Sequence, residues 1–263
     1  MNLSLWLFSM EYKTKTQRME LIDLLKFIGT GSAFRPELGN NGAYIKKGTS
    51  LFLIDCGSST FAKLQQSDLL TDVTDITVLM THLHPDHAGS LGDLIFYGYY
   101  SMGEMAVKNV TVLAPPSLQV ELFLKLSGVV SEFYHYTPLE GVQTIEVGDT
   151  RIQVEPIVVE HVPYIPCYGY VLTLDGESIY YSGDSNQIPS TILERFKQGE
   201  FVAFYQDTCK AEYPGNVHMP LTDLIEVIPQ VLRSKVYCMH FDDSFDFSRA
   251  IEEGFNVVTA DLP

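Results

Sequence analysis

The chain has 263 residues and carries 33 acidic against 17 basic side chains, which gives a formal net charge of −16 at pH 7. This charge excludes a protein that holds duplex nucleic acid or an anionic membrane through a general basic field. Hydrophobic residues make up 46% of the sequence and charged residues only 19%, so the chain has enough apolar surface for one large domain or two small ones.

The first eighteen residues have an apolar start but neither a basic n-region nor a small-residue cleavage site, so they do not fit a signal peptide. We expect residues 1–18 to be an N-terminal extension, or the product of an upstream start codon, ahead of a single domain at residues 19–263. No run of about eighteen apolar residues predicts a membrane span. The four cysteines are far apart and form no CxxC pair, which favours reduced thiols and a cytoplasmic location.

Hydrophobic patterning then predicts strands and helices to the end of the chain. We expect strands at residues 21–28, 43–46, 50–54, 76–80, 110–114, 144–147, 151–159, 168–174, 178–182, 201–205, 235–239 and 257–259. We expect helices at residues 58–66, 88–97, 117–126, 191–197, 221–232 and 248–253. This order favours an α/β protein with sheets packed inside and helices outside.

The strongest chemical signal is the run Thr81-His82-Leu83-His84-Pro85-Asp86-His87, because three of the seven histidines fall within six positions. Imidazole and carboxylate groups are the ligands that zinc and similar divalent metals prefer. In an extended backbone His82 and His84 point the same way, since their side chains are two positions apart. Asp86 and His87 lie beyond the proline bend and can point at a second ion. The run therefore predicts a centre for two metal ions.

Three later residues stand at or beyond predicted strand ends, where a sheet places loops around one site. They are His161, Asp184 and His240. Taken alone, His161 also fits a structural histidine and Asp184 a turn residue. A bridging carboxylate suits two ions about 3.5–4 Å apart. We assign one ion to His82, His84 and His161 and the other to Asp86, His87 and His240, with Asp184 as the bridge.

The order of these residues resembles the metallo-β-lactamase fold superfamily from about Glu20 onward. Its tRNase Z and phosphodiesterase branch is the most similar, on the segments Gly29-Thr30-Gly31-Ser32-Ala33-Phe34, Leu53-Ile54-Asp55-Cys56-Gly57, His161-Val162-Pro163 and Met239-His240-Phe241. The resemblance implies an αββα sandwich for residues 19–263 and two bound divalent ions, zinc or manganese. It also implies a homodimer, in which the segment 97–105 is a candidate for reaching the partner. Asp55 and Thr30 fit either supporting contacts at the site or ordinary turns.

A second feature of that branch is an acidic residue and a later histidine that together protonate the leaving oxygen. Asp207 and His218 resemble this pair, and Asp86 joins them in the predicted catalytic set. A carboxylate beside an imidazole orients it and raises its pKa, which makes it a competent acid. The alternatives are that His218 caps the following helix and that Asp207 is a strand-end turn residue. Lactam and thioester hydrolases of this fold do not usually present the pair.

Two differences from the sequences of tRNase Z enzymes narrow the range of expected substrates. Positions 161 and 184 are only 23 apart, and residues 163–182 contain no Lys or Arg, so there is no room for the basic tRNA-binding arm. We therefore expect a small phosphodiester substrate and no long nucleic acid. The anti-Pycsar cyclic-nucleotide phosphodiesterases are the group that the chain most resembles, which implies hydrolysis of 3′,5′-cyclic mononucleotides. The alternatives are a tRNase Z-like RNA 3′-processing endonuclease, a lactone or thioester hydrolase, and a non-catalytic nucleotide binder.

Tyrosines near the metal-binding run suggest how a nucleobase is held. Tyr97, Tyr99 and Tyr100 follow the run, and Tyr164 and Tyr168 follow His161. Nucleobases stack on such rings. Core packing is the more common role of a tyrosine, so both interpretations stay open.

Overall fold

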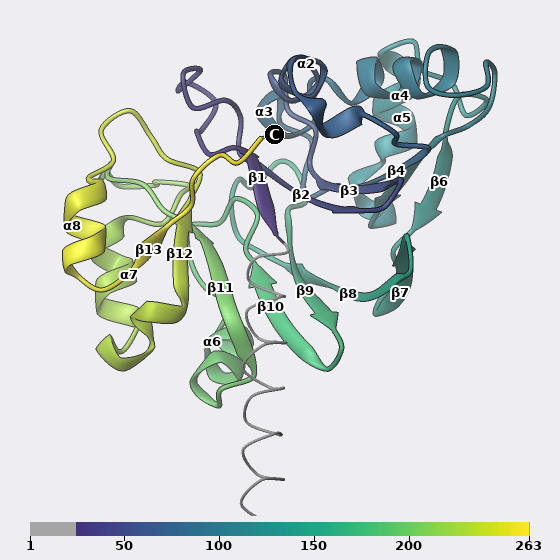
Figure 1. Cartoon of the computed structure of the whole chain (residues 1–263). Coiled ribbons are helices and arrows are strands. Elements are labelled where there is room, and N and C mark those ends of the chain that lie inside the picture. The colour runs from purple at the N-terminus through teal and green to yellow at the C-terminus, as the bar shows by residue number, and fades with distance from the viewer. Residues whose placement is uncertain (1–24, 263) are drawn as a thin grey trace, which may run out of the picture.

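Two β-sheets pack against each other at the centre of the molecule, and helices cover the outer side of each sheet (Figure 1). The structure is a computed structural model that describes residues 25–262. This arrangement is the αββα sandwich predicted from the sequence. The predicted extension at residues 1–18 lies outside the described residues.

The first half of the chain forms a six-stranded sheet in the order β1-β2-β3-β4-β5-β6. Its strands are β1 (Lys26–Gly29), β2 (Gly42–Lys47), β3 (Ser50–Ile54), β4 (Asp75–Leu79), β5 (Val110–Ala114) and β6 (His135–Pro138). The pairs from β1 to β3 are antiparallel, and those from β3 to β6 are parallel. The carboxyl ends of β3 and β4 therefore lie at the same edge of the sheet.

The second half forms a seven-stranded sheet in the order β13-β12-β11-β10-β9-β8-β7. Its strands are β7 (Gln143–Val147), β8 (Thr150–Val158), β9 (Tyr168–Leu174), β10 (Glu177–Tyr181), β11 (Phe201–Asp207), β12 (Val236–Met239) and β13 (Asn256–Val257). The pairs from β7 to β10 are antiparallel, whereas β10, β11, β12 and β13 run parallel. The parallel strands again bring their carboxyl ends together.

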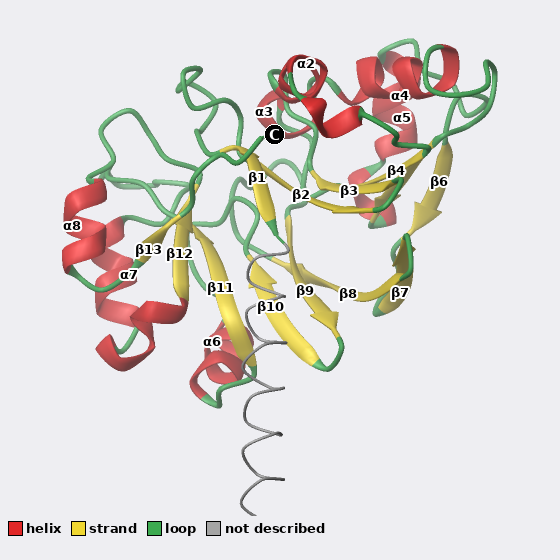
Figure 2. Ribbon diagram, in the orientation of Figure 1, coloured by secondary structure: helices red, strands yellow, loops and turns green. Residues whose placement is uncertain are grey.

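The helices lie in two groups, one over each sheet, as Figure 2 shows in red. The described α-helices are α2 (Thr60–Gln66), α3 (Pro85–Ala88), α4 (Leu91–Tyr100), α5 (Val120–Leu126), α6 (Ser190–Lys197), α7 (Leu221–Val227) and α8 (Phe247–Glu252). Short 3₁₀ turns are η1 (Asp68–Leu70), η2 (Pro116–Leu118) and η3 (Gln230–Lys235). Helices α2, α4 and α5 cover the first sheet, and α6, α7 and α8 cover the second. Among the described residues, no helix is both long and apolar enough to cross a membrane.

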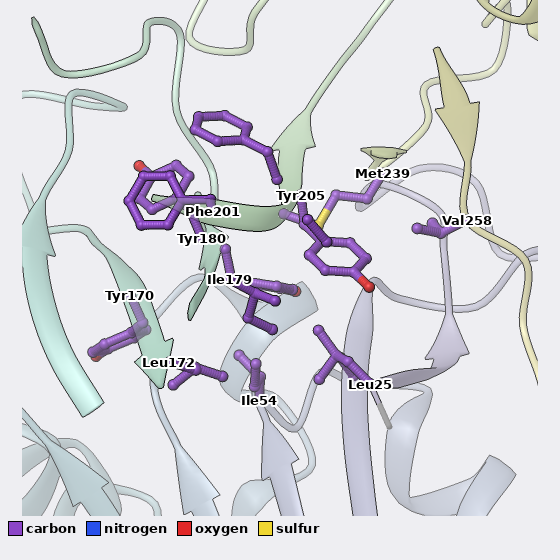
Figure 3. Close-up of a cluster of buried hydrophobic side chains, with 14 of the residues drawn as sticks. Leu25, Ile54, Tyr170, Leu172, Ile179, Tyr180, Phe201, Tyr205, Met239 and Val258 are labelled. Atoms are coloured by element: carbon purple, nitrogen blue, oxygen red, sulfur yellow. The ribbon is translucent and has the colours of Figure 1, made fainter. Parts of the chain in front are cut away.

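Alternation along β3 shows why the sandwich forms. Leu51 and Leu53 pack among the helices of the first sheet, whereas Phe52 and Ile54 pack toward the second sheet. All four side chains are buried, because successive residues of a strand point to opposite faces and both faces are covered. Figure 3 shows the layer between the sheets, where Ile54 lies in one cluster with Leu172 and Ile179.

Some predicted elements differ from the structure. The predicted helix at 221–232 ends at Val227, because Pro229 cannot continue it, and the chain resumes as a 3₁₀ turn. The helix predicted at 88–97 corresponds to α4, which begins at Leu91 and ends at Tyr100, and the short helix α3 precedes it. Strand β6 was not predicted, since its sequence, His-Tyr-Thr-Pro, is polar and ends in proline. All four cysteines are free and buried.

Candidate metal centre

The predicted site residues meet where the two sheets bring their strand ends together. In the first sheet, β4 leads into the loop with His82 and His84. In the second sheet, Asp184 follows β10, Asp207 ends β11 and His240 follows β12. Because these strands run parallel, residues far apart in sequence arrive at one place.

The first cluster contains three histidines from two loops. Nε2 of His82 lies 3.1 Å from Nδ1 of His84, and Nε2 of His161 lies 3.2 Å from the same atom. The loop between β8 and β9 supplies His161. Three imidazole nitrogens at this separation can hold one metal ion. The structure therefore brings together the three residues assigned to the first ion.

The second cluster contains the carboxylates and histidines assigned to the other ion. Nε2 of His87 lies 3.5 Å from Oδ2 of Asp86, and Nε2 of His240 lies 3.4 Å from that oxygen. These side chains and Asp184 can hold one ion. Asp86 and His87 belong to α3, which directly follows the His82–His84 loop.

Asp184 lies between the two clusters. Its Oδ2 is 3.8 Å from Nε2 of both His82 and His161, and 3.4 Å from Nε2 of His240. Its Oδ1 is 3.2 Å from Nε2 of His87. This position suits the predicted bridge, because one carboxylate faces the nitrogens of both clusters.

Unpaired polar atoms indicate that the centre is built for cations. Nε2 of His87 and Oδ1 of Asp184 are buried, and although they lie 3.2 Å from each other, neither makes a hydrogen bond to any described residue. Burial of an unpaired polar atom costs free energy, so such atoms call for a ligand. Nitrogen and carboxylate ligands in this combination suit zinc and similar divalent ions. The residues present fit two such ions.

The pKa values of the centre follow from burial and from its mixed charges. Burial lowers the pKa of His82, which keeps this imidazole neutral. Burial alone would also lower the pKa of His240, but the charges of Asp184 and Asp207 outweigh it and raise that pKa to about 10. Burial likewise favours neutral Asp86, yet His87 and His240 hold its pKa below its usual range. A cation that binds His240 must therefore displace a proton.

Asp55 fixes the orientation of His87. The carboxylate accepts hydrogen bonds from the backbone N–H and the hydroxyl of Thr81, at 2.8 and 2.7 Å, and from Nδ1 of His87 at 2.8 Å. With Nδ1 used in this way, Nε2 of His87 faces Asp184. Of the two interpretations left open for Asp55, the structure shows the supporting contact. Its backbone is also left-handed, at φ 67°, as is that of His240 at 61°.

His218 and Asp207 form a hydrogen-bonded pair next to the metal-ligand cluster. Nδ1 of His218 lies 2.7 Å from Oδ2 of Asp207 and 3.9 Å from Oδ2 of Asp184. Burial opposes a charge on His218, but Asp207 raises its pKa above the ordinary value. Pro220, not His218, stands at the N-cap of α7, so the capping alternative is wrong. Asp207 is the last residue of β11, not a turn residue.

A cavity of about 810 Å³ opens onto the centre. Its walls include candidate ligands of both clusters and His218. None of the described residues that line it is Lys or Arg. Three aromatic side chains line it, namely Phe34, Tyr164 and Tyr213. Among the described lining residues, histidines are the side chains that can carry positive charge.

Of the five tyrosines suggested as base platforms, Tyr164 alone is among the described residues that line the cavity, and stacking of a base on it stays a prediction. Tyr164 lines the cavity, whereas the hydroxyl of Tyr168 is bound to Ser117, 2.7 Å away. Tyr99 and Tyr100 pack against Phe133 on the far side of the first sheet. Tyr97 packs against Phe61. Phe34 and Tyr213 are not among the predicted site residues. Tyr213 has no motif around it, and Phe34 entered only as the end of the family-like segment at residues 29–34.

The sandwich and the His/Asp cluster at its strand ends define a protein of the metallo-β-lactamase fold. The structure is similar to the metallo-β-lactamase fold protein YhfI from Bacillus subtilis, with a TM-score of 0.69 at 17% identity, over 90% of this chain and 96% of that one. It is also similar to a diphosphatase from the PhnP family, with a TM-score of 0.68 at 15% identity, over 90% and 95% of the two chains.

Sequence comparison identifies the family within this fold. The profile of the family described as anti-Pycsar protein Apyc1 matches residues 24–260, so the chain belongs to the Apyc1 family. An anti-Pycsar protein Apyc1 from Paenibacillus harenae is 27% identical over 228 residues, covering 84% of this chain and 91% of the relative. Another from Bacillus phage BSP38 is 28% identical over 243 residues, covering 84% and 90%. The family resemblance predicted from the sequence is confirmed.

Proposed function

We propose that the protein is a metal-dependent phosphodiesterase that opens 3′,5′-cyclic mononucleotides to nucleoside monophosphates. Its membership of a family named for anti-Pycsar proteins supports a role against bacterial cyclic-nucleotide immune signalling. The observation that carries the proposal is the pair of Asp207 and His218, hydrogen-bonded beside Asp184. A phosphodiester needs such a proton donor, because an alkoxide is a poor leaving group.

Two divalent cations, with zinc expected and manganese as the alternative, would be held by seven side chains. The proposed ligands are His82, His84, Asp86, His87, His161, Asp184 and His240. When bound, such cations lower the pKa of water and neutralise the charge that develops on phosphoryl oxygens. Asp86 also borders the cavity, which supports its place in the proposed catalytic set.

The chain itself supplies the proton for the leaving oxygen. Because Nδ1 of His218 donates to Asp207, Nε2 is the position from which the protonated imidazole can give up a proton. The oxygen of water bonds to phosphorus as one of its protons passes to solvent, the bond from phosphorus to O3′ breaks, and O3′ takes the Nε2 proton. The neutral imidazole then regains a proton from solvent, so that the turnover consumes one water molecule. Asp207 stabilises the positive imidazolium until that transfer, and its own charge does not change.

The cavity supports a small, singly charged substrate. A volume of about 810 Å³ is in the range of small-molecule sites. With no Lys or Arg among the described lining residues, the walls offer little to a polyanion. The short connection from His161 through β9 and β10 to Asp184 leaves no arm for tRNA. These features favour a cyclic mononucleotide over the RNA endonuclease alternative.

A substrate panel tests the proposal directly. The purified protein, after measurement of its metal content, is incubated with cyclic mononucleotides, cyclic dinucleotides, bis-p-nitrophenyl phosphate, precursor tRNA, a lactone and a thioester. We expect the highest kcat/KM with a cyclic mononucleotide. Cleavage of precursor tRNA alone, or of the lactone or thioester alone, would show that the proposed substrate is wrong. Light scattering on the same sample tests the homodimer, which stays a prediction.

Replacement of His218 tests the leaving-group role. His218→Ala should lower kcat for a cyclic nucleotide by about 10²- to 10⁴-fold, the usual contribution of a general acid, with metal content retained. His135→Ala is the matched control, because His135 is exposed on β6. If His218→Ala keeps full kcat, another group protonates O3′.

A further inference from the structure

We infer that Tyr164, with Phe34 and Tyr213, binds the nucleobase of the substrate by stacking in the cavity beside the metal centre. The inference rests on the proposed function, since it assigns binding residues to one part of a cyclic nucleotide. It concerns which residues set affinity for the base, and not the chemistry at phosphorus.

The three aromatic rings are exposed to solvent. Phe34 is 86% exposed, Tyr164 72% and Tyr213 55%. They come from three separate loops, after β1, between β8 and β9, and between β11 and α7, yet all line one cavity. A single exposed aromatic residue is ordinary, whereas several gathered around one opening mark a binding surface for a flat apolar group.

Tyr164 lies beside the candidate metal centre. Its ring centroid lies 6.1 Å from that of His84, a proposed ligand of the first ion, at an interplanar angle of 52°. A phosphate at the metal centre therefore lies close to the Tyr164 ring. In a cyclic mononucleotide only one ribose separates the phosphate from the base, so a base that extends into the cavity comes within reach of the Tyr164 ring, and Phe34 and Tyr213 line the same cavity.

The polar side chains of the cavity point to recognition of the base by its face. The side-chain oxygen of Asn40 accepts the backbone N–H of Ser59 at 2.8 Å. The amide of Asn216 donates to the carbonyl of Ala211 at 2.7 Å, and its oxygen accepts the N–H of His218 at 3.2 Å. Because these three groups already bond to the protein, they have little left to offer the base, whereas the exposed ring faces can stack on it.

Steady-state kinetics with two substrates tests the inference. One is 3′,5′-cyclic uridine monophosphate, and the other is 1-deoxyribose 3,5-cyclic phosphate, which has the same phosphodiester ring and no base. For the unaltered protein we expect a KM about tenfold lower for the nucleotide, the effect of one base stacked on an aromatic ring. Tyr164→Ala should bring the ratio of the two KM values toward one, whereas Tyr164→Phe should preserve it.

Leu126→Ala is the matched control, because Leu126 is 81% exposed on α5 and lies outside the cavity. If Tyr164→Ala, Phe34→Ala, Tyr213→Ala and the triple variant all keep the original KM ratio with full metal content, the stacking inference is wrong and the proposed function stands. If the unaltered protein hydrolyses neither cyclic phosphate, the proposed function is wrong and the inference falls with it.

Discussion

Asp55 is the residue whose interpretation depends most on the structure. Its carboxylate accepts a hydrogen bond from Nδ1–H of His87 and thereby leaves Nε2 free to face the candidate metal centre. A carboxylate or carbonyl in this position fixes the tautomer of a metal-binding histidine. His161 is oriented in the same way, because its Nδ1 lies 2.9 Å from the carbonyl oxygen of Val217 and its Nε2 therefore faces the other histidines.

Asp55→Asn should weaken cation binding by about 10- to 100-fold, the usual effect of losing such a partner. The amide can present an N–H group to Nδ1 of His87, which favours the tautomer protonated at Nε2 and so blocks the ligand atom. Calorimetric titration of the metal-free protein measures the affinity. Asp149→Asn is the control, since Asp149 is exposed in the turn after β7. Equal affinity in the unaltered protein and the Asp55 variant would leave Asp55 with a purely structural role.

The difference between Asp55 and the metal-binding run shows how far the sequence predicts the site. His82, His84, Asp86 and His87 lie within six positions, so local spacing reveals them. Asp55 contacts Thr81 and His87 across 26 and 32 positions, and its left-handed backbone is common for aspartate in turns. Phe34 and Tyr213 are likewise placed by the fold and not by any local pattern.

At the scale of elements, the segment after β3 packs closely against α3. The backbone N–H of Cys56 donates to the carbonyl of His87 at 2.7 Å, and that of Ser58 donates to the carbonyl of Pro85 at 3.0 Å. Gly57 lies between them, where a β-carbon would overlap the backbone carbonyl of Asp86. A side chain at position 57 therefore has to displace the helix that carries two proposed ligands.

Gly57→Ala should lower the free energy of unfolding by about 1–3 kcal/mol, the range for overpacking a tight contact, and weaken cation binding at the same time. Thermal unfolding with and without metal measures both effects. Gly92→Ala is the control, because its β-carbon would meet only a methyl group of Val129 at 3.2 Å and alanine favours the helix α4. A Gly57 variant with native stability and metal affinity would contradict the close-packing argument.

The elements themselves were predictable where a continuous apolar run has the length of a buried strand, as in β3 and β11. The sequence was a poorer guide to where helices end. Pro229 stops α7 soon after Val227, although the apolar pattern continues beyond it. Gln119 adopts a left-handed backbone between η2 and α5 and interrupts the helix predicted at 117–126. A single residue is enough to end or interrupt a helix in this way, and the hydrophobic pattern averaged over several residues does not reveal it.

At the scale of the whole molecule, we expect the net charge to determine how salt changes kcat/KM. The protein has a formal net charge of −16, and none of the described residues that line its cavity is Lys or Arg. An anionic substrate therefore approaches a mainly negative surface. Screening should raise kcat/KM for a cyclic nucleotide by about twofold between 10 and 150 mM salt. A steep fall over that range, as in proteins that bind nucleic acid through basic patches, would contradict this account. Thermal unfolding across the series controls for effects on stability.

The division of the chain into two sheets has a consequence for assembly. Strands β1–β6 end at Pro138, and β7 begins at Gln143, so each sheet is one continuous half of the sequence. The first half contributes the proposed ligands at positions 82–87, and the second contributes those proposed at 161, 184 and 240. Cation binding and docking of the halves are thus thermodynamically linked. We expect a chain cut between Pro138 and Gln143 to reassemble in a metal-dependent way, as a split protein whose two fragments recover the proposed activity when a divalent cation is added.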